Sequence, residues 1–276
     1  MSLRLSMMSY TLARGEWGKR RDIPELCRFA VELGMDAVDW VSTYGKEPAE
    51  LRRVTDDHGL RTVCHTFNAP LHAIDAEIRR QAADAVKRGL EAAAVLGAPR
   101  VMIVVSGQKG TPRAVSREWA LEGLAAAVQA AAPLGITVTI EPFPGEQSPF
   151  VTTADLRLAL RAVPGLKFTY DNGNLVTGGD DPAAAFSELH EHFVHAHFKD
   201  WSVVPEGLRG LDGRCYRGAL VGEGIVAPAP CLAAMRRAGY AGHVNFEYEG
   251  NAYDPFEATR RGVKLLRELW GAQSTT

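Results

Sequence analysis

Short apolar runs alternate along the chain with longer segments in which apolar residues recur every three or four positions. The short runs are typical of buried strands and the longer segments of amphipathic helices. The predicted strands cover residues 3–10, 36–41, 61–67, 100–107, 135–143, 166–174, 192–200 and 243–250. The predicted helices cover residues 22–34, 48–59, 75–96, 115–132, 154–162, 181–191, 228–238 and 254–269. We expect the last residues, 270–276, to be a frayed tail.

The predicted elements form eight strand–helix pairs that follow one another without a linker or a change in composition. Strands that alternate with helices indicate a parallel sheet. Eight such units in 276 residues predict a closed (β/α)8 barrel, the TIM barrel, as a single domain over residues 1–276. A doubly wound open sheet is the alternative architecture. In a barrel, the active site lies at the C-terminal ends of the strands.

Four predicted strands in the second half of the chain carry apolar residues on one face and polar residues on the other. Parallel strands are normally buried on both faces and read as continuous apolar runs. Because helices cover the outside of a barrel, the polar faces must line its interior. The residues at the C-terminal ends of these faces are Glu141, Asp171, His197 and Glu247. We therefore expect these four side chains to converge in the mouth of the barrel.

Three carboxylates that converge in a barrel mouth repel one another strongly unless a cation lies between them. One bound divalent metal ion removes this repulsion, and carboxylate oxygens with one imidazole suit Mn, Mg, Co or Zn. Taken singly, such residues are more often solvated or capping carboxylates and satisfied core histidines. Their shared position on four strands favours the metal site. His195 lies one layer deeper than His197 and is either structural or a support for it.

Composition narrows the classes of protein that the chain can be. The net charge of -2 and the pI of about 6.5 give no basic footprint for nucleic acid or for a membrane surface. No apolar run approaches the ~20 residues of a membrane span, and the N-terminus has no signal-peptide pattern, so we expect a cytoplasmic protein. The four cysteines are scattered, which disfavours disulfides and a structural zinc cluster. No GxGxxG or GxxxxGKS/T motif supports a nucleotide cofactor.

Five motifs carry a resemblance to a known family: IEPF at 140–143, YDNGN at 170–174, HAHFKD at 195–200, VGEGIV at 221–226 and GYAGHVNFEYEG at 239–250. Through them the chain resembles the sugar phosphate isomerase/epimerase family of the xylose-isomerase-like TIM-barrel superfamily, which also contains endonuclease IV. The resemblance extends over nearly the whole chain. It implies that the four convergent residues are metal ligands. It also implies that Glu141 and Glu247 act as an acid–base pair on the substrate carbon.

Two positions depart from the pattern of the superfamily. Its members often have Asp-x-x-His on the sixth strand, with the histidine bound to substrate or to a further metal, and Asn174 takes that place here. Endonuclease IV-like members have a histidine after the fourth strand, where this chain has Ser106. With the absence of a basic patch, these departures argue against a trinuclear zinc site and against DNA repair.

The resemblance implies a divalent-metal-dependent isomerase or epimerase that acts on a small-molecule sugar, keto-sugar or related polyol through a metal-stabilised enediolate. Glu141 or Glu247 would remove a proton beside the carbonyl, and the same or the other carboxylate would return it. The alternative is a dehydratase of the inosose or dehydroshikimate type on the same scaffold. A non-catalytic sugar-binding protein is a third interpretation, against which the complete set of four ligands argues.

Other residues near the predicted strand ends are candidate substrate contacts. Lys199 lies on the same inward face as His197 and can bind an anionic group of a substrate, whereas an ion pair with Asp171 or Glu141 is the alternative. The remaining candidates are His65, Asn174, Glu146, Trp201 and Arg217. The two charged loop residues among them can instead be solvated, and the loop after the seventh strand is a candidate lid. The exposed helices of a barrel also allow a homo-oligomer.

Overall fold

Eight parallel strands close into a barrel in the order β1-β11-β7-β6-β5-β4-β3-β2. The structure, a computed structural model, describes residues 2–272. The barrel strands are β1 (Leu5–Met8), β2 (Ala37–Val41), β3 (Arg61–Asn68), β4 (Arg100–Val104), β5 (Thr137–Ile140), β6 (Lys167–Asp171), β7 (Phe193–Phe198) and β11 (Val244–Phe246). β1 pairs with β2 on one side and with β11 on the other, which closes the barrel. The predicted TIM barrel is confirmed, and the open doubly wound sheet is wrong.

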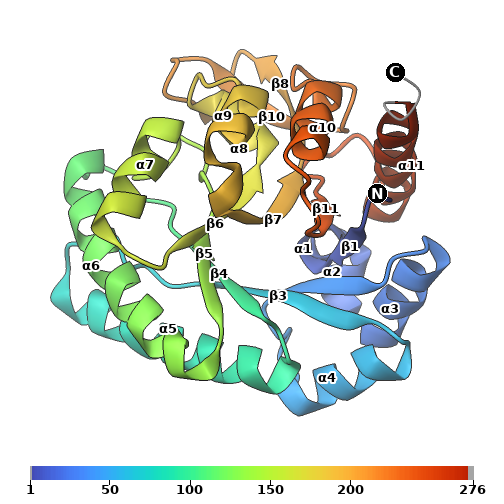
Figure 1. Cartoon of the computed structure of the whole chain (residues 1–276), viewed down its shortest axis with the longest axis horizontal. Coiled ribbons are helices and arrows are strands. Elements are labelled where there is room, and N and C mark those ends of the chain that lie inside the picture. Colours follow the sequence, from blue (N-terminus) through green and yellow to red (C-terminus); the bar gives the residue numbers. More distant parts are fainter. Residues whose placement is uncertain (1, 273–276) are drawn as a thin grey trace.

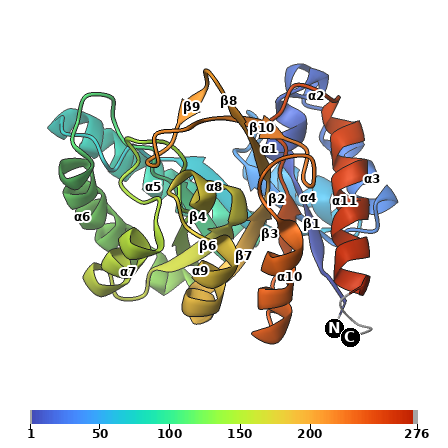
Figure 2. The ribbon, with the colours of Figure 1, turned by 90° about the horizontal axis from the view of Figure 1, so that it is seen from above.

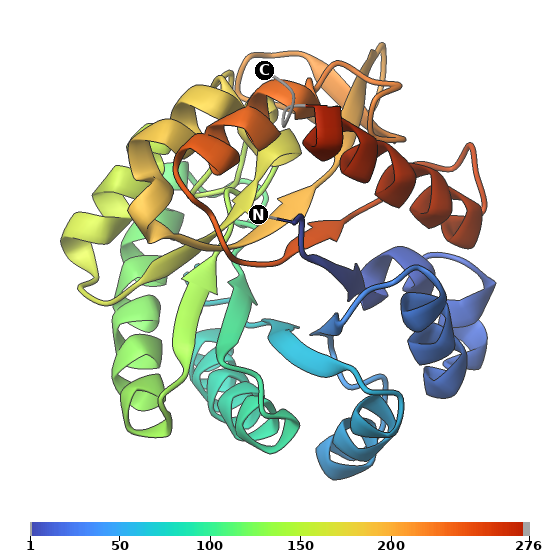
Figure 3. The ribbon, with the colours of Figure 1, turned by 45° about the vertical axis from the view of Figure 1, so that its right-hand side comes forward.

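A longer helix follows each barrel strand and packs on its outer face (Figure 1). These helices are α3 (Ile23–Glu32), α4 (Pro48–Asp57), α5 (Ala76–Leu96), α6 (Arg113–Ala131), α7 (Thr153–Ala162), α9 (Pro182–Leu189), α10 (Pro228–Arg237) and α11 (Pro255–Ala272). Figure 3 shows them around the strands, so the molecule is a single-domain TIM barrel. Each predicted pair is present, because apolar positions three and four apart give a helix one face to bury. None of the helices within residues 2–272 is both long and apolar enough to cross a bilayer.

Helix α11 continues to Ala272, beyond the predicted helix end at residue 269. Trp270 is only 6% exposed and belongs to the main apolar core. The expected fraying is therefore wrong for residues 270–272, because burial of Trp270 holds the last turn of the helix. Residues 273–276, the rest of the expected tail, lie outside the described part of the chain.

Short helices replace the ends of two predicted strands. β1 ends at Met8 and β6 ends at Asp171, and a helical turn begins at the next residue in each case. The Asp171 side chain accepts the backbone N–H of Asn174 at 2.8 Å, so one residue both ends the strand and caps the helix. The short elements are α1 (Ser9–Ala13), α2 (Glu16–Arg20), α8 (Asn172–Thr177) and the 3-10 turns η1 (Ala132–Leu134) and η2 (His190–His192).

The predicted loop after the seventh barrel strand is instead a small antiparallel sheet. Its strands are β8 (Asp200–Val204), β9 (Leu208–Arg209) and β10 (Cys215–Ala219), in the order β8-β10-β9. Trp201 and Tyr216 are buried and pack with Val226 in an apolar cluster separate from the main core. This cluster gives the segment apolar surface to bury, which an irregular loop would lack. Figure 2 shows the sheet above the end of the barrel at which β7 leads into β8.

The interior of the barrel is polar, as the alternation in the four strands predicts. The hydroxyls of Thr139 in β5 and Thr169 in β6 are hydrogen-bonded at 3.0 Å, and both residues are fully buried. Ser6 of β1 donates to Asn245 of β11 where these two strands close the barrel. Outward residues such as Val138 lie in the apolar core between strands and helices. The polar lining leads up to the ends of the strands.

Candidate functional site

Four strand ends meet at the mouth of the barrel and bring together Glu141, Asp171, His197 and Glu247. Asp171 and His197 are at the ends of β6 and β7, whereas the two glutamates directly follow β5 and β11. One ligand atom from each of the four lies within 4.8 Å of the others. All four are buried, with exposed fractions from 0% to 8%. We call them the mouth cluster, and the strand alternation predicts all of its members.

A cavity of about 220 Å³ adjoins the mouth cluster. Four ionisable residues line one part of it: Glu141, Lys199, Glu247 and Glu249. The other lining residues are Met8, Tyr10, Val41, Thr66, Asn68, Met102, Val104, Phe143 and Pro144. The lining of the cavity therefore combines charged groups with hydroxyl, amide and apolar groups.

Lys199 supplies a buried positive charge beside the mouth cluster. Its Nζ lies 3.3 Å from Asp171 Oδ2, 3.0 Å from Glu247 Oε2 and 2.7 Å from Glu249 Oε1. The side chain is only 3% exposed. The ion pair with Asp171 that the sequence allows is present, and two glutamates join it.

Burial strongly changes the protonation of the mouth cluster. It raises the pKa of Asp171 to about 7 and that of Glu247 to about 8, although the Lys199 ammonium opposes both shifts. For His197, burial lowers the pKa, but hydrogen bonds to neighbouring carboxylates outweigh burial and the net pKa is well above its usual value. Without a cation, the cluster therefore holds protons on these groups at weakly acidic pH.

The donor set of the mouth cluster fits a divalent cation. Asp171 Oδ2 and Glu247 Oε2 are buried, and within the described residues each forms an ion pair with Lys199 Nζ, at 3.3 and 3.0 Å, but no hydrogen bond. His197 Nδ1 faces the carboxylates, 3.2 Å from Glu141 Oε2 and 3.6 Å from Glu247 Oε2. The one ammonium of Lys199 cannot balance Asp171, Glu247 and Glu249 together, and a bound cation would supply the missing positive charge. Carboxylate oxygens with one imidazole match the preferences of Mn, Mg, Co and Zn.

Asp39 of β2 is a buried charged residue that the four-strand pattern does not include. Its Oδ2 lies 2.9 Å from His195 Nε2 and 3.4 Å from His197 Nε2. His195, one layer below His197, is thus bonded to a carboxylate inside the barrel and does not face the cavity. In the sequence, DAVDWV places Asp39 in a predicted strand. The alternation test does not select it, because Asp39 shares its face with Ala37 and Val41.

His65 of β3 points away from the mouth. Its neighbour Thr66 points into the barrel, where its hydroxyl donates to Asp39 Oδ1 at 3.1 Å. Alternation along the strand turns His65 outward, and its Nδ1 lies 3.0 Å from the carbonyl oxygen of Trp40. It lines a separate cavity of about 500 Å³ together with residues of α5. The structure thus corrects the expected contact between His65 and a substrate in the mouth.

Glu146 and Arg217 are surface residues. Glu146 is exposed, and its carboxylate lies 3.2 Å from Nε of Arg209 in β9. Arg217 is exposed on β10. Neither is among the described residues that line the mouth cavity. Charges in such positions keep their hydration readily, which fits the solvated alternative, and the contact of either residue with a substrate stays a prediction.

Trp201 and Asn174 are buried near the mouth cluster but do not line its cavity. The ring of Trp201 has its centroid 5.8 Å from Lys199 Nζ and belongs to the small apolar cluster under β10. Trp201 therefore packs beside Lys199, and its expected contact with a substrate stays a prediction. Neither polar atom of the Asn174 amide has a hydrogen-bond partner among the described residues. Its contact with a substrate stays a prediction.

Glu249 and Tyr10 line the cavity, and the four-strand pattern does not select them. Glu249 lies two residues beyond Glu247 on the same inward face, so the alternation contains its signal. The Lys199 ammonium, 2.7 Å away, lowers the pKa of Glu249 against the opposing effect of burial. Tyr10 lies in α1, where no strand alternation marks it.

Asp200 fixes the loop that contains the VGEGIV motif. Its carboxylate accepts backbone N–H groups at 2.8 or 2.9 Å from Trp201, Gly222, Gly224 and Val226. A side chain at Gly224 would collide with this carboxylate, because a Cβ there would lie 2.2 Å from Oδ1. The glycine of the motif therefore lets the loop backbone lie close to the Asp200 carboxylate. Asp200 in turn caps the N–H groups of this loop.

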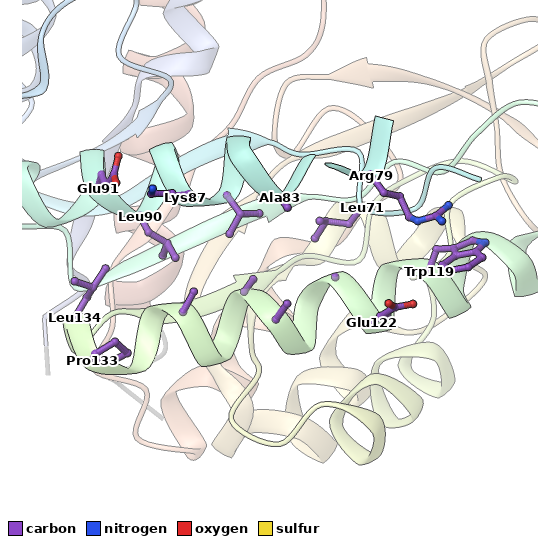
Figure 4. A pocket seen from close by; sticks show the side chains of 15 residues that line it. Leu71, Arg79, Ala83, Lys87, Leu90, Glu91, Trp119, Glu122, Pro133 and Leu134 are labelled. Carbon is purple, nitrogen blue, oxygen red and sulfur yellow. The ribbon is translucent and has the colours of Figure 1, made fainter. Parts of the chain in front are cut away.

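A larger cavity lies on the outside of the barrel. It is a groove of about 530 Å³ between α5 and α6, and Figure 4 shows its side chains along both helices. We call it the α5–α6 groove, lined by Leu71, Arg79, Ala83, Val86, Lys87, Leu90, Glu91, Trp119, Glu122, Gly123, Ala126, Ala127, Ala130, Pro133 and Leu134. The Arg79 guanidinium lies 3.7 Å from the ring centroid of Trp119. Within residues 2–272, the groups of residues that could hold a metal lie in the barrel and not here.

Comparison of the chain with models of known protein families identifies one family. A family model described as xylose isomerase-like TIM barrel matches residues 27–269. This segment contains β2 to β11 and therefore every member of the mouth cluster. No curated protein matches the chain in sequence.

Solved structures of the same fold align with nearly the whole chain. The 3-keto-D-glucoside 4-epimerase of E. coli is 19% identical with a TM-score of 0.76, and the match covers 97% of this chain and 100% of that chain. The probable 3-DHS dehydratase of Bacillus anthracis is 16% identical with a TM-score of 0.76, covering 96% and 98%. The IolI protein, solved with a zinc atom, is 15% identical with a TM-score of 0.79, covering 98% and 99%. Identities this low establish a common fold.

Proposed function

The chain belongs to the family of xylose isomerase-like TIM barrels, and on this premise we propose that it is a divalent-metal-dependent isomerase or epimerase of a small carbohydrate. The substrate would be a sugar, a keto-sugar or a related polyol. The observation that carries the proposal is the buried mouth cluster of three carboxylates and one histidine. Epimerases and a dehydratase among the solved structures of this fold support enzymatic activity.

The mouth cluster would hold the cation through three carboxylate oxygens and Nδ1 of His197. Bound there, a divalent cation supplies Lewis-acid polarisation of a carbonyl group, which makes the neighbouring C–H bond more acidic. Lys199 would keep a second positive charge beside Asp171 and Glu247, at the wall of the cavity. Both charges favour the same negatively charged reaction intermediate.

Glu141 and Glu247 are the proposed acid–base pair, because both carboxylates line the cavity. One of them would remove the proton from the carbon beside the carbonyl and leave an enediolate. Return of the proton to the opposite face by the other carboxylate gives an epimer. Return to the neighbouring carbon by the first carboxylate gives an isomer. A positioned carboxylate contributes a rate factor of roughly 10²–10⁴ in such proton transfers.

The lining of the cavity favours a neutral, polyhydroxylated substrate. Tyr10, Thr66 and Asn68 offer hydroxyl and amide groups that can bond to sugar hydroxyls. No arginine is among the described residues that line the cavity. Lys199, the lining cation, is already paired with three carboxylates. A phosphate group would therefore find no unpaired cationic side chain in the described lining of the cavity.

A dehydratase is the second candidate, because Lys199 holds a buried ammonium 3.0 Å from Glu247. After Glu247 or Glu141 has removed the C–H proton, this ammonium can protonate a hydroxyl that leaves from the neighbouring carbon, so water is lost. The dehydratase among the structures of the same fold supports this alternative. The same residues thus serve two reactions that differ in the fate of one hydroxyl.

The test begins with metal analysis of the purified protein, followed by assays in deuterated water against ketoses and keto-polyols with the metal restored. Solvent deuterium incorporated in a product of unchanged formula would establish an isomerase or epimerase. Loss of water with a new absorbing product would establish the dehydratase. A metal-loaded protein that is inert to the whole panel, but whose melting temperature rises with one sugar, would overturn both in favour of a sugar-binding protein.

A further inference from the structure

Asp39 lies inside the barrel, directly below the mouth cluster, and contacts one of its members from the side away from the cavity. We propose that Asp39 is a positioning residue that fixes the imidazole of His197 with Nδ1 directed at the cation. This inference rests on the proposed metal site and concerns how the protein prepares it. Asp39 itself does not line the mouth cavity, so the role is indirect.

Three other barrel strands, of which only β3 is a neighbour of β2, hold the Asp39 carboxylate in place. His195 Nε2 of β7 and Asn245 Nδ2 of β11 each lie 2.9 Å from Oδ2. The Thr66 hydroxyl of β3 donates to Oδ1 at 3.1 Å. All of these residues are almost completely buried, with exposed fractions of 0% or 1%. A carboxylate anchored from three strands cannot rotate freely, so it can define the orientation of a ring that bonds to it.

The ring of His197 lies between Asp39 and the carboxylates of the mouth cluster. Its Nε2 is 3.4 Å from Asp39 Oδ2, and its Nδ1 is 3.2 Å from Glu141 Oε2 on the opposite side. When Nε2 carries the proton and donates it to Asp39, Nδ1 keeps a lone pair directed at the carboxylates. That tautomer is the one a metal ligand needs, and a carboxylate behind the ring selects it.

The donors around Asp39 compensate the cost of burying its charge, and a neutral residue could fill the same space without that cost. What a charged acceptor adds at this position is the contact with His197. The arrangement places a negatively charged acceptor 3.4 Å from the rear nitrogen of the proposed ligand histidine. His195 and Asn245 then act as donors that keep the acceptor ionised and still.

The chain contains a matched pair that serves as a control. Asp36, just before β2, lies 2.9 Å from His243 Nε2, so it repeats the aspartate–histidine contact at the other end of the same strand. The Asp36 side chain is 46% exposed, and neither partner belongs to the residues that could hold a metal. The change Asp36→Asn therefore alters the same chemistry without touching the mouth cluster.

The experiment measures binding of Zn²⁺ alone to the full chain by competition with a chelating indicator. We expect Asp39→Asn to weaken the affinity 10- to 100-fold, as loss of such outer partners typically does. The Zn²⁺ affinity of Asp36→Asn should lie within about threefold of that of the unchanged protein, because Asp36 does not contact a proposed metal ligand. Nitrogen NMR of the Zn²⁺-loaded, unsubstituted protein supplies a readout that does not depend on the folding of any variant. It should show His197 with its proton on Nε2.

The possible outcomes distinguish failure of the proposed metal site from failure of the proposed role of Asp39. An unsubstituted protein that binds no Zn²⁺, Mn²⁺ or Co²⁺ would overturn the proposed metal site and this inference with it. Tight binding that Asp39→Asn leaves unchanged would overturn the role of Asp39 alone. Tight binding with the His197 proton on Nδ1 would do the same, even if Asp39→Asn failed to fold.

Discussion

The mouth cavity and the α5–α6 groove differ in volume and in the burial of their charged side chains, and the second difference indicates which of them binds a ligand. The groove is the larger, about 530 Å³ against about 220 Å³. Its charged side chains, such as Lys87, Glu91 and Glu122, are exposed and keep their hydration. In the mouth, by contrast, carboxylates, an imidazole and an ammonium are buried together. Burial of charge is costly, so its concentration marks the region where a ligand compensates the cost.

The largest expected difference between the two regions is in turnover. Glu247→Gln keeps the shape of the side chain but removes the proposed base and one negative charge from the mouth cluster. Turnover should fall by roughly 10²–10⁴, and the affinity for the divalent cation should fall with it. Steady-state assays with the substrate found by the screen, together with a metal titration, measure both effects.

Glu122→Gln in the α5–α6 groove is the matched control for this change. Glu122 is exposed, so its loss should leave turnover and metal affinity as they are. Equal effects of the two substitutions would contradict the distinction between the regions. Full activity and undiminished metal in Glu247→Gln would remove Glu247 from the proposed chemistry.

Removal of the metal should affect the mouth and spare the groove. Free cation at about 100 times its Kd stabilises the folded state by about 2.7 kcal/mol, so chelation should lower the melting temperature and added Mn²⁺ should restore it. Hydrogen exchange should slow on cation binding at the ends of β5, β6, β7 and β11. Exchange in α5 and α6 should not change. A uniform change over the whole barrel would contradict a local site.

Metal affinity should increase with pH. The raised pKa values of Asp171, about 7, and Glu247, about 8, mean that both carboxyls hold protons below those values in the protein without cation. Binding must displace these protons, so affinity should rise by up to about tenfold per pH unit for each proton released between pH 6 and 8. Calorimetry in buffers of different ionisation enthalpy counts the released protons. An affinity that is constant over this range would contradict the protonated state of the cluster.

The smallest expected effect is in the groove. Trp119→Ala removes the ring under the Arg79 guanidinium, and a cation–π contact at such a half-exposed site contributes about 0.5–1 kcal/mol. The free energy of unfolding in urea should fall by about that amount plus the lost packing of a half-buried ring. Metal affinity should remain unchanged. A loss of metal binding in this variant would show that the groove and the mouth are coupled.

The alternation of polar and apolar residues predicted the mouth cluster because strand parity is a local property. Glu141 and Glu247 could be assigned to an inward face from their immediate neighbours alone. The strand that contains His65 gave no such signal, since RTVCHTF has polar and apolar residues on both faces. Its orientation became clear only from the bond between Thr66 and Asp39. Parity predicts a site where the two faces differ and is silent where they do not.

The sequence by itself determined the eight strand–helix pairs and four side chains at the strand ends, because each depends on periodicities that span a few residues. It left the open sheet as an alternative to the closed barrel, and the pairing of β1 with β11 and β2 decided between them. The tertiary structure decided which inward groups meet. Asp39 and His195 are 156 residues apart and become bonded only when the barrel closes. Closure also decided that Lys199 forms ion pairs with three carboxylates and that the segment after β7 folds into a small sheet. Contacts between distant strands depend on register and packing, which no local pattern encodes.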